Sequence, residues 1–563
     1  MPNKKDLFSV ILLFILAILL LRNLLQSGIY SSHDSEVHVA RLAQFNQAIK
    51  EGQFPVRWLA NWNFGYGYPT FVYSYSLPYY LGAFLKIFIP NFETIFKLLI
   101  FLSVLLSGVT FYIFARQLTA PLSALIGSVF YLTAPYRFAD VYERGALGEA
   151  FVFIFLPLLF LSPHTILRSK TSLLRSKISL KRNKSLGFLI TSLTVFAVIT
   201  THALTFLIFL LPAVFYSLLF LKGDFKKMKL YISAIVFGFL LAAFQWLPMV
   251  FEQKYIQLDQ TYFNIFQGNF ISTFQLLRIP HAGVNIGTGI QLGLAQVFIV
   301  LFTLVYILYL RISKRKTELL VVFLFLSVII AAFLTTNLSR EIWTDIKPLQ
   351  TLIFPWRFLT YTTFATAFLA SLLANNLTFK KSWLAFFFLI FLAIFPSRHY
   401  LKGYNWYSFS DNYYLRYADP LKLDNYYLPK GLTKNLELLP PDPVSIIEGD
   451  GQIKIIKKQS NQLQIAAHLK KNSKVQFHTL YFPGWELTID GAKTAIITNT
   501  PHLEGIVTAE IPAGNHKAVL KFEETPLRRQ GNFLTLASFL ILLLLIAKYY
   551  SFGQFSKATK QVL

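Results

Sequence analysis

Long apolar runs separated by short polar segments dominate the sequence up to residue 396. A helix needs about 20 predominantly apolar residues to cross the roughly 30 Å of hydrocarbon in a bilayer. About 12 runs approach this length, and they predict transmembrane helices at 6–25, 94–115, 118–135, 149–163, 187–201, 203–221, 230–250, 290–310, 317–336, 357–377, 383–396 and 531–548. The pattern therefore predicts an all-α polytopic membrane domain of about 12 transmembrane helices.

The pattern changes near residue 397, where apolar and polar residues begin to alternate. This two-residue period is typical of β-strands, and it is found in four runs: Gln462–His468, Lys474–Tyr481, Trp485–Ile489 and Lys517–Phe522. The dipeptide Asp490-Gly491 is a typical hairpin turn. We therefore predict an extracytoplasmic β-sandwich-like domain at 397–530, followed by a final transmembrane helix and a tail at 531–563.

The composition is that of a membrane protein. Only 14% of the residues are charged and the mean hydropathy is +0.50, whereas soluble domains have about 25% charged residues. The net charge of +26 is spread over short basic clusters between the apolar runs, which argues against nucleic acid as a partner. The sequence has no cysteine, so disulfide bonds and thiol catalysis are excluded.

The basic clusters also indicate which loops face the cytoplasm, because Lys and Arg accumulate in cytoplasmic loops. The segment 164–186 is rich in both and has no acid. It falls on the cytoplasmic side only if the apolar segment 73–89 lies in the interface or re-enters the membrane. We therefore predict a multi-pass protein of the cell membrane with both termini in the cytoplasm. The predicted outer segments are 26–93, 136–148, 251–289, 337–356 and 397–530.

The polar residues best suited to chemistry lie in these outer segments or at the outer ends of spans. They are His33, Asp34, Glu36, His38, Arg57, Glu143, Arg144, Glu149, His202 and Arg357. Charges at membrane depth are costly, and such residues usually face a cavity or a pathway. A carboxylate in this position is suited to taking a proton from a sugar hydroxyl or to holding a divalent cation.

Several of these residues also have a structural interpretation. Asp34 and Glu36 are typical of a solvated helix cap. Arg144 and Arg357 are as well suited to anchoring the chain at the interface as to binding phosphate. A lone histidine on an apolar turn, such as His202, is more often structural than catalytic.

Several short motifs, taken in order, resemble known membrane protein families. The acid-rich first outer segment is similar to the start of lipid-phosphate-sugar glycosyltransferases of the GT-C fold, together with Gly52-Gln53-Phe54-Pro55, Leu77-Pro78-Tyr79-Tyr80 and Ala115-Arg116-Gln117-Leu118. The chain more closely resembles bacterial YfhO-like and 6-pyruvoyl-tetrahydropterin synthase-related membrane proteins, through His33-Asp34 to Tyr80, Glu143-Arg144-Gly145, Pro355-Trp356-Arg357-Phe358 and Tyr481-Phe482-Pro483-Gly484-Trp485 with Asp490-Gly491.

The resemblance implies a GT-C-like membrane domain at 1–396 and a glycosyltransferase reaction on the outer side of the membrane. In that reaction a sugar leaves a polyprenyl-phosphate carrier and joins an envelope lipid, glycan or protein. An acid of the first outer segment acts as base or metal ligand in that family, which indicates Asp34 and then Glu36, with Glu143 assisting. The other polar residues named above form the predicted substrate-binding set: His33, His38, Arg57, Arg144, Glu149, His202 and Arg357.

Alternatives are open for the cofactor and for the function. The first two outer segments, 26–93 and 136–148, have no Asp-x-Asp pattern, since the first reads Asp34-Ser35-Glu36. A divalent cation, Mg²⁺ or Mn²⁺, held by Asp34 and Glu36 is one alternative, and transfer without a metal is the other. The alternative functions are a transporter or flippase of lipid-linked sugars and a non-catalytic envelope assembly protein. A transporter predicts ionisable residues in mid-span and repeated halves, whereas the polar residues here gather on one side.

Overall fold

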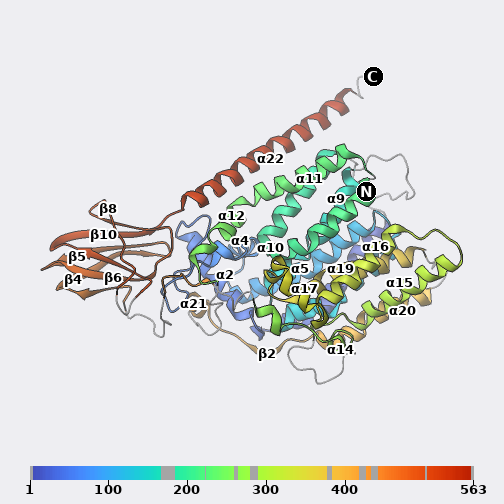
Figure 1. Cartoon of the computed structure of the whole chain (residues 1–563), viewed down its shortest axis with the longest axis horizontal. Helices are drawn as coiled ribbons and strands as arrows, with labels where there is room; N and C mark the ends of the chain where they lie inside the picture. The colour runs from blue at the N-terminus through green and yellow to red at the C-terminus, as the bar shows by residue number, and fades with distance from the viewer. Residues whose placement is uncertain are drawn as a thin grey trace.

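The computed structural model describes residues 4–166, 184–221, 223–258, 264–278, 289–376, 383–417, 427–432, 442–500 and 504–559. Most of its helices form one bundle, and its two larger sheets lie together at one end of the molecule (Figure 1). The final helix, α22 (Pro526–Thr559), begins beside the sheets, and its C-terminal end points away from them (Figure 1). The chain therefore has a helical part and a C-terminal β part that precedes the last helix.

Six helical segments in these ranges are long and apolar enough to cross a membrane. They are Phe92–Ala115 (α5), Leu147–Ile166 (α8, Leu147–Val152, with α9, Leu156–Ile166), Lys184–Leu221 (α10), Leu294–Ile312 (α15), Pro355–Asn376 (a short turn with α19, Phe358–Asn376) and Pro526–Ala547 in α22. A seventh candidate is the pair α11 (Phe225–Leu241) and α12 (Ala243–Phe251), which is bent by 76°.

The other predicted spans are shorter helices. They are α1 (Lys4–Leu20), α6 (Pro121–Thr133), α16 (Leu319–Leu334) and α20 (Trp383–Ile394). The longest of them has 17 residues, which corresponds to about 26 Å of helix and falls short of the hydrocarbon thickness. The structure thus shows six or seven candidate spans by length and composition. The difference from the twelve predicted runs comes from these four shorter helices and from α10, which is counted once but contains two predicted runs.

Helix α10 contains two of the predicted spans because it doubles back on itself. Its backbone is not helical at His202, where φ is −164° and ψ is 85°. Gly187, near its start, lies against Ile166, and the hydroxyl of Tyr216, near its end, contacts His164. Since both contacts are with the C-terminal end of α9, the two halves of α10 run antiparallel. His202 therefore lies at the far end of these helices.

The first outer segment forms a layer of short elements beside the bundle. They are β1 (Ile29–Ser31), α2 (Ser35–Lys50), α3 (Thr70–Tyr73) and α4 (Leu77–Leu85). Helix α4 has 9 residues, or about 14 Å, which is shorter than the hydrocarbon thickness. That 73–89 lies in the interface or re-enters the membrane stays a prediction. Strand β1 pairs with β2 (Tyr404–Tyr407), which brings the chain that follows the bundle back to the first outer segment.

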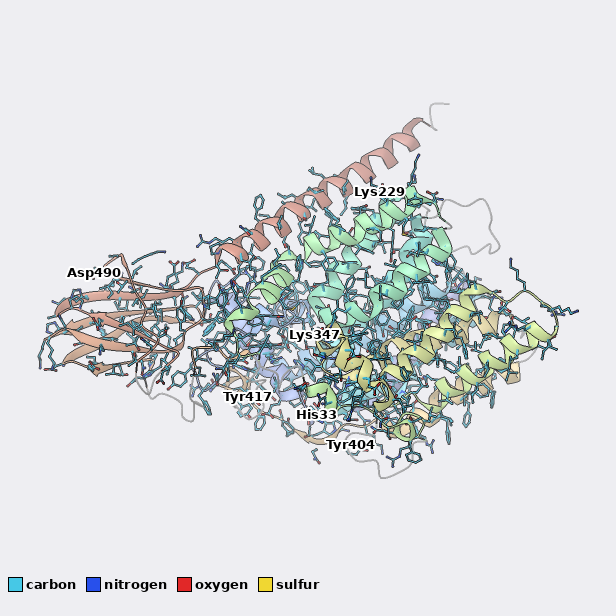
Figure 2. The ribbon with its side chains drawn as sticks, viewed as in Figure 1. His33, Lys229, Lys347, Tyr404, Tyr417 and Asp490 are labelled. Carbon is cyan, nitrogen blue, oxygen red and sulfur yellow. The ribbon has the colours of Figure 1, made fainter. Side chains whose placement is uncertain are left out.

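The remaining loops carry short helices. They are α7 (Pro135–Phe138), a π-helical turn at Ala139–Glu143, α14 (Thr273–Leu276), α17 (Arg340–Asp345), α18 (Lys347–Gln350) and α21 (Asp411–Leu415). His33 in the first outer segment and Lys229 in α11 lie on opposite sides of the bundle (Figure 2). Many of the Lys and Arg residues that indicate which side faces the cytoplasm, at 167–183, 222 and 377–382, lie outside the described residues. Which side faces the cytoplasm therefore stays a prediction.

The β part consists of two antiparallel sheets. One has the order β4 (Gly451–Gln459), β5 (Gln462–Leu469), β10 (Gly514–Phe522), β7 (Trp485–Ile489) and β8 (Ala492–Thr494), and the other β3 (Val444–Glu448), β6 (Ser473–Leu480) and β9 (Ile506–Ile511). Ile465 and Leu520 of the first sheet share one core with Phe477 and Val507 of the second. The two sheets therefore pack face to face as a sandwich, and the four predicted strands are confirmed.

The first outer segment anchors this sandwich to the helical part. Trp58 is 1% exposed and packs against Trp485 and Phe522, with ring centroids 5.4 and 5.3 Å apart. The adjacent Arg57 places its Nε 3.1 Å from Glu524 Oε1, just before α22. Trp485 thus belongs to the core, as its place in an alternating strand predicts.

A buried ion pair at the start of α22 forms a second connection. Arg528 Nη2 lies 2.7 Å from Glu252 Oε2, and both side chains are almost fully buried. Gly484 has a φ of +118°, and a Cβ there would lie 2.6 Å from the carbonyl oxygen of Glu523. The Phe-Pro-Gly-Trp motif therefore needs its glycine because the chain passes this junction closely and in a left-handed conformation.

Candidate active site

The two outer segments that carry the predicted catalytic acids are in direct backbone contact. The N–H of His33 donates to the carbonyl oxygen of Glu143 at 3.0 Å, and the N–H of Asp34 donates to the carbonyl oxygen of Arg144 at 2.8 Å. Residues more than a hundred positions apart in the sequence are therefore held side by side by the backbone itself.

These segments form part of the wall of a cavity of about 650 Å³, a volume typical of small-molecule sites. The predicted site residues that line it are His33, Asp34, His38, Glu143, Arg144, Glu149, His202 and Arg357. They come from the start of α2, the segment 143–149, the break in α10 and the turn before α19. Four segments that are distant in the sequence thus meet at one cavity.

Asp34 presents a carboxylate to this cavity. It occupies the N-cap position of α2, but its side chain makes no capping hydrogen bond to the first turn. The side chain is half-buried and lines the cavity. The structure therefore does not show the helix-capping role that the sequence indicated for Asp34.

Arg144 is held by two buried carboxylates. Its Nη1 lies 2.6 Å from Asp140 Oδ1 and 2.7 Å from Glu149 Oε2. Glu149 is 1% exposed and also accepts hydrogen bonds from the hydroxyls of Tyr136 and Thr360. Because these partners fix its position on two sides, Arg144 is suited to shaping the cavity wall.

Arg357 is the second predicted site arginine in the cavity wall, and it has a buried N–H donor that makes no hydrogen bond to a described residue. Its Nη1 donates to the carbonyl oxygen of Leu352, and its guanidinium lies 5.0 Å from the centre of the Phe354 ring. Its Nε is buried, lies 3.7 Å from Glu149 Oε2, and makes no hydrogen bond to a described residue. The indole N–H of Trp356 is also buried and makes no hydrogen bond to a described residue. Since buried donors normally have an acceptor, an anion in the cavity would satisfy both.

The histidine on α2 is neutral at physiological pH. His38 Nδ1 lies 2.7 Å from the hydroxyl of Tyr79. Burial, together with the positive charges of Arg41 and Arg144, lowers the pKa of His38 well below its usual range. Within the cavity this imidazole is therefore an uncharged hydrogen-bonding group.

Two predicted site residues lie outside the cavity. Glu36 accepts hydrogen bonds from the hydroxyls of Tyr407 and Tyr413, and Arg57 forms the ion pair at the base of α22. Glu36 lies outside the cavity because of helical geometry: residues that are two positions apart on a helix point in directions about 200° apart. Asp34 and Glu36 therefore face different neighbours.

A divalent cation held by Asp34 and Glu36 does not fit this arrangement. The two carboxylates diverge, and across the described ranges no three His, Asp or Glu side chains are grouped as metal ligands. Mg²⁺ and Mn²⁺ are normally bound by several oxygen ligands. The structure therefore does not bring Asp34 and Glu36 together as ligands of one ion, and the metal requirement stays a prediction.

Comparison with known families supports the fold assignment. A family model described as 6-pyruvoyl-tetrahydropterin synthase related domain, membrane protein, matches residues 71–404, more than half of the chain. The chain belongs to this family. The match includes the parts of the cavity wall that come from 143–149, α10 and the turn before α19, whereas Asp34 precedes it. No curated protein sequence matches the chain.

This 6-pyruvoyl-tetrahydropterin synthase-related (PTPS-related) chain also shows a distant likeness to solved glycosyltransferases. The arabinofuranosyltransferase AftD from Mycobacteria is 12% identical, with a TM-score of 0.45 over 71% of this chain and 27% of that one. The oligosaccharyltransferase AglB from Archaeoglobus fulgidus, in complex with an inhibitory peptide and a dolichol-phosphate, is 13% identical, with a TM-score of 0.42 over 74% of this chain and 56% of that one. The chain thus spans only part of the length of either.

Three polar residues of the PTPS-related site were not among those predicted. Asp140 lies four positions before Arg144, a spacing typical of helical ion pairs, so the sequence did contain a signal for it. Arg41 lines the cavity three positions after His38, which places it on the same face of α2. The hydroxyl of Tyr136 reaches Glu149, and no pattern in the sequence indicates that contact.

Gly145 is expected to be essential for the contact between the two outer segments. It has a φ of +64°, and a Cβ there would lie 2.3 Å from Ser32 Oγ and 2.8 Å from the Ser35 nitrogen. We expect Gly145→Ala to move Asp34 away from Arg144 and to reduce activity about tenfold or more, because small displacements of reacting groups are costly. Gly268→Ala, with no atom within 4 Å of its Cβ, is the matched control and is expected to keep full activity.

Proposed function

We propose that this protein transfers a sugar from a polyprenyl-phosphate carrier to a hydroxyl of an envelope lipid, glycan or protein on the outer side of the membrane. One observation carries the proposal. A single cavity combines the carboxylate of Asp34 with the buried, unused donor of Arg357, beside segments long and apolar enough to lie in a membrane. A glycosyl phosphate and an acceptor hydroxyl require these two kinds of group.

The proposed reaction is a substitution at the anomeric carbon of the donor sugar. The acceptor oxygen forms a bond to that carbon, and the bond between the carbon and the phosphate oxygen breaks. Asp34 takes the proton of the acceptor hydroxyl as general base. The carrier leaves as polyprenyl phosphate, which keeps the electron pair of the broken bond, and Glu143 at the cavity wall assists in orienting the acceptor.

The geometry favours Arg357 over Arg144 as the residue that binds the phosphate. Arg144 is already bound by Asp140 and Glu149, whereas Arg357 has a buried Nε without an acceptor in the part of the chain that the structure describes. Donors fixed in a shielded site stabilise the charge that develops on a leaving group. Arg144 then acts as a positioning residue for the wall.

The test of this proposal is the transfer of a labelled sugar from a polyprenyl-phosphate donor by the purified protein in lipid nanodiscs. We expect Arg357→Gln to raise KM for the donor about tenfold or more, since a charge-assisted hydrogen bond to phosphate is lost. Arg340→Gln, at an exposed arginine outside the cavity, is the matched control and should leave KM unchanged. Mass spectrometry of lipid-linked and surface glycans, with and without the gene, identifies the donor and the acceptor.

The proposal and its main alternative give different results when the same labelled donor is supplied to the protein reconstituted in sealed vesicles. A transporter or flippase moves the intact lipid-linked sugar, so the label stays on the carrier. Labelled carrier recovered unchanged from vesicles in which it has crossed the membrane would support transport and contradict transfer. A new labelled glycan or lipid that depends on Arg357 supports transfer.

A further inference from the structure

A second cavity, of about 450 Å³, lies toward the other end of α2 from Asp34. Its lining comes from α2, from α21 and from the turn between β4 and β5, so it lies where the sandwich meets the helical part. Most of the lining residues are polar, and five of them are amides: Gln44, Gln47, Asn61, Asn412 and Gln459. Amides both donate and accept hydrogen bonds, as sugar hydroxyls do.

Gln44 provides a buried acceptor in this cavity. It is 3% exposed, and its Nε2 donates to the carbonyl oxygen of Tyr417 at 2.9 Å. Its Oε1 is buried and receives no hydrogen bond from a described residue. Such an acceptor is satisfied by a ligand that brings a hydroxyl group.

The charged residues of the cavity leave an excess of positive charge. The single acid, Glu51, already accepts hydrogen bonds from Gln47 Nε2 and from the Ser460 nitrogen. Arg416 and Lys458 line the same cavity, are exposed, and form no ion pair with another described residue. These two cations are therefore available to a carboxylate or phosphate group.

We propose that this cleft binds an oligosaccharide that carries negative charge. The amides bind its hydroxyl groups, and Arg416 and Lys458 bind its anionic groups. Gln47 lies 13 positions along α2 from Asp34, a distance of about 20 Å at 1.5 Å per residue, so a glycan must be at least that long to contact both this cleft and the candidate active site. That last connection rests on the proposed function, whereas the binding itself does not.

The test measures binding of labelled oligosaccharides to the full-length protein in detergent, without turnover. The probes are a galacturonic acid oligosaccharide, a phosphorylated mannose oligosaccharide and a neutral galactose oligosaccharide of equal length. We expect at least one acidic probe to bind more tightly than the neutral probe, and to weaken with added salt. The probe that binds identifies whether the anionic group is a carboxylate or a phosphate.

Variants connect that binding to the cleft. We expect the double variant Arg416→Ala, Lys458→Ala to weaken binding of the acidic probe about 100-fold, or tenfold for each cation. Lys457→Ala, at the exposed neighbour that does not line the cleft, is the matched control and should bind normally. Equal binding of neutral and acidic probes, no binding of either acidic probe, or unchanged binding in the double variant would each overturn the proposal. Asp34→Asn is expected to bind the probe normally, so a failure of the proposed transfer reaction leaves this test intact.

Discussion

Asp34→Asn is expected to lose sugar transfer by about 10²–10⁴-fold, the usual contribution of a general base. Asn has the same shape, the Asp34 side chain makes no capping hydrogen bond that the substitution could lose, and the backbone N–H still donates to the carbonyl oxygen of Arg144. The fold should therefore be kept while the proton acceptor is lost. The measurement is the initial rate of transfer at saturating donor, together with the unfolding temperature of the purified variant.

Glu36→Gln is the matched control for this substitution. Glu36 lies two positions further along the chain, outside the cavity, and its two oxygens accept from the hydroxyls of Tyr407 and Tyr413. In glutamine the oxygen keeps one of these hydrogen bonds, and the amide nitrogen donates to the other hydroxyl. We expect this variant to retain its transfer rate. Full activity in Asp34→Asn, or an equal loss in both variants, contradicts the assignment of Asp34 as the base.

Glu149→Ala is expected to cause the largest loss of stability, about 3–5 kcal/mol of the free energy of unfolding. The carboxylate of Glu149 is 1% exposed, lies 2.7 Å from Arg144 and 3.7 Å from Arg357, and accepts from Tyr136. Its removal leaves buried positive charge with less compensation and leaves a buried hydroxyl without its acceptor. Chemical unfolding in detergent, followed by tryptophan fluorescence, measures the effect.

Glu448→Ala provides the matched control, because Glu448 also forms an ion pair, with Lys474, but both side chains are exposed. Exposed pairs contribute less than about 1 kcal/mol, so its free energy of unfolding should change little. A double variant that also replaces Arg144 with Ala should lose less than the sum of the two single losses, since the two side chains act as a pair. Additive losses would show that the ion pair does not stabilise the wall.

The sequence was most informative where a pattern repeats over many residues. Apolar runs predicted a helical membrane domain, and two-residue alternation predicted the strands of the sandwich, because burial imposes a fixed period on each element. The residues around Asp34 and around Glu143 could be proposed together because both groups lie on the predicted outer side at the membrane boundary, where a charge that enters the membrane is costly. Each predicted run is helical, but only six or seven segments are long enough to count as candidate spans, because hydropathy does not mark where a helix ends and a turn begins.

The tertiary structure decided how these residues divide into separate roles. Asp34 and Glu36 are similar in sequence, but only Asp34 lines the cavity, since the turn of α2 directs them to different neighbours. In the sequence, Arg144 and Arg357 were equivalent candidates for binding phosphate, but in the structure Arg144 forms ion pairs with two carboxylates. Such distinctions depend on contacts between segments far apart in the chain, and no local pattern encodes them. The sequence alone thus determined which elements form and which residue types collect near the predicted outer surface, while packing decided which of those residues share a cavity.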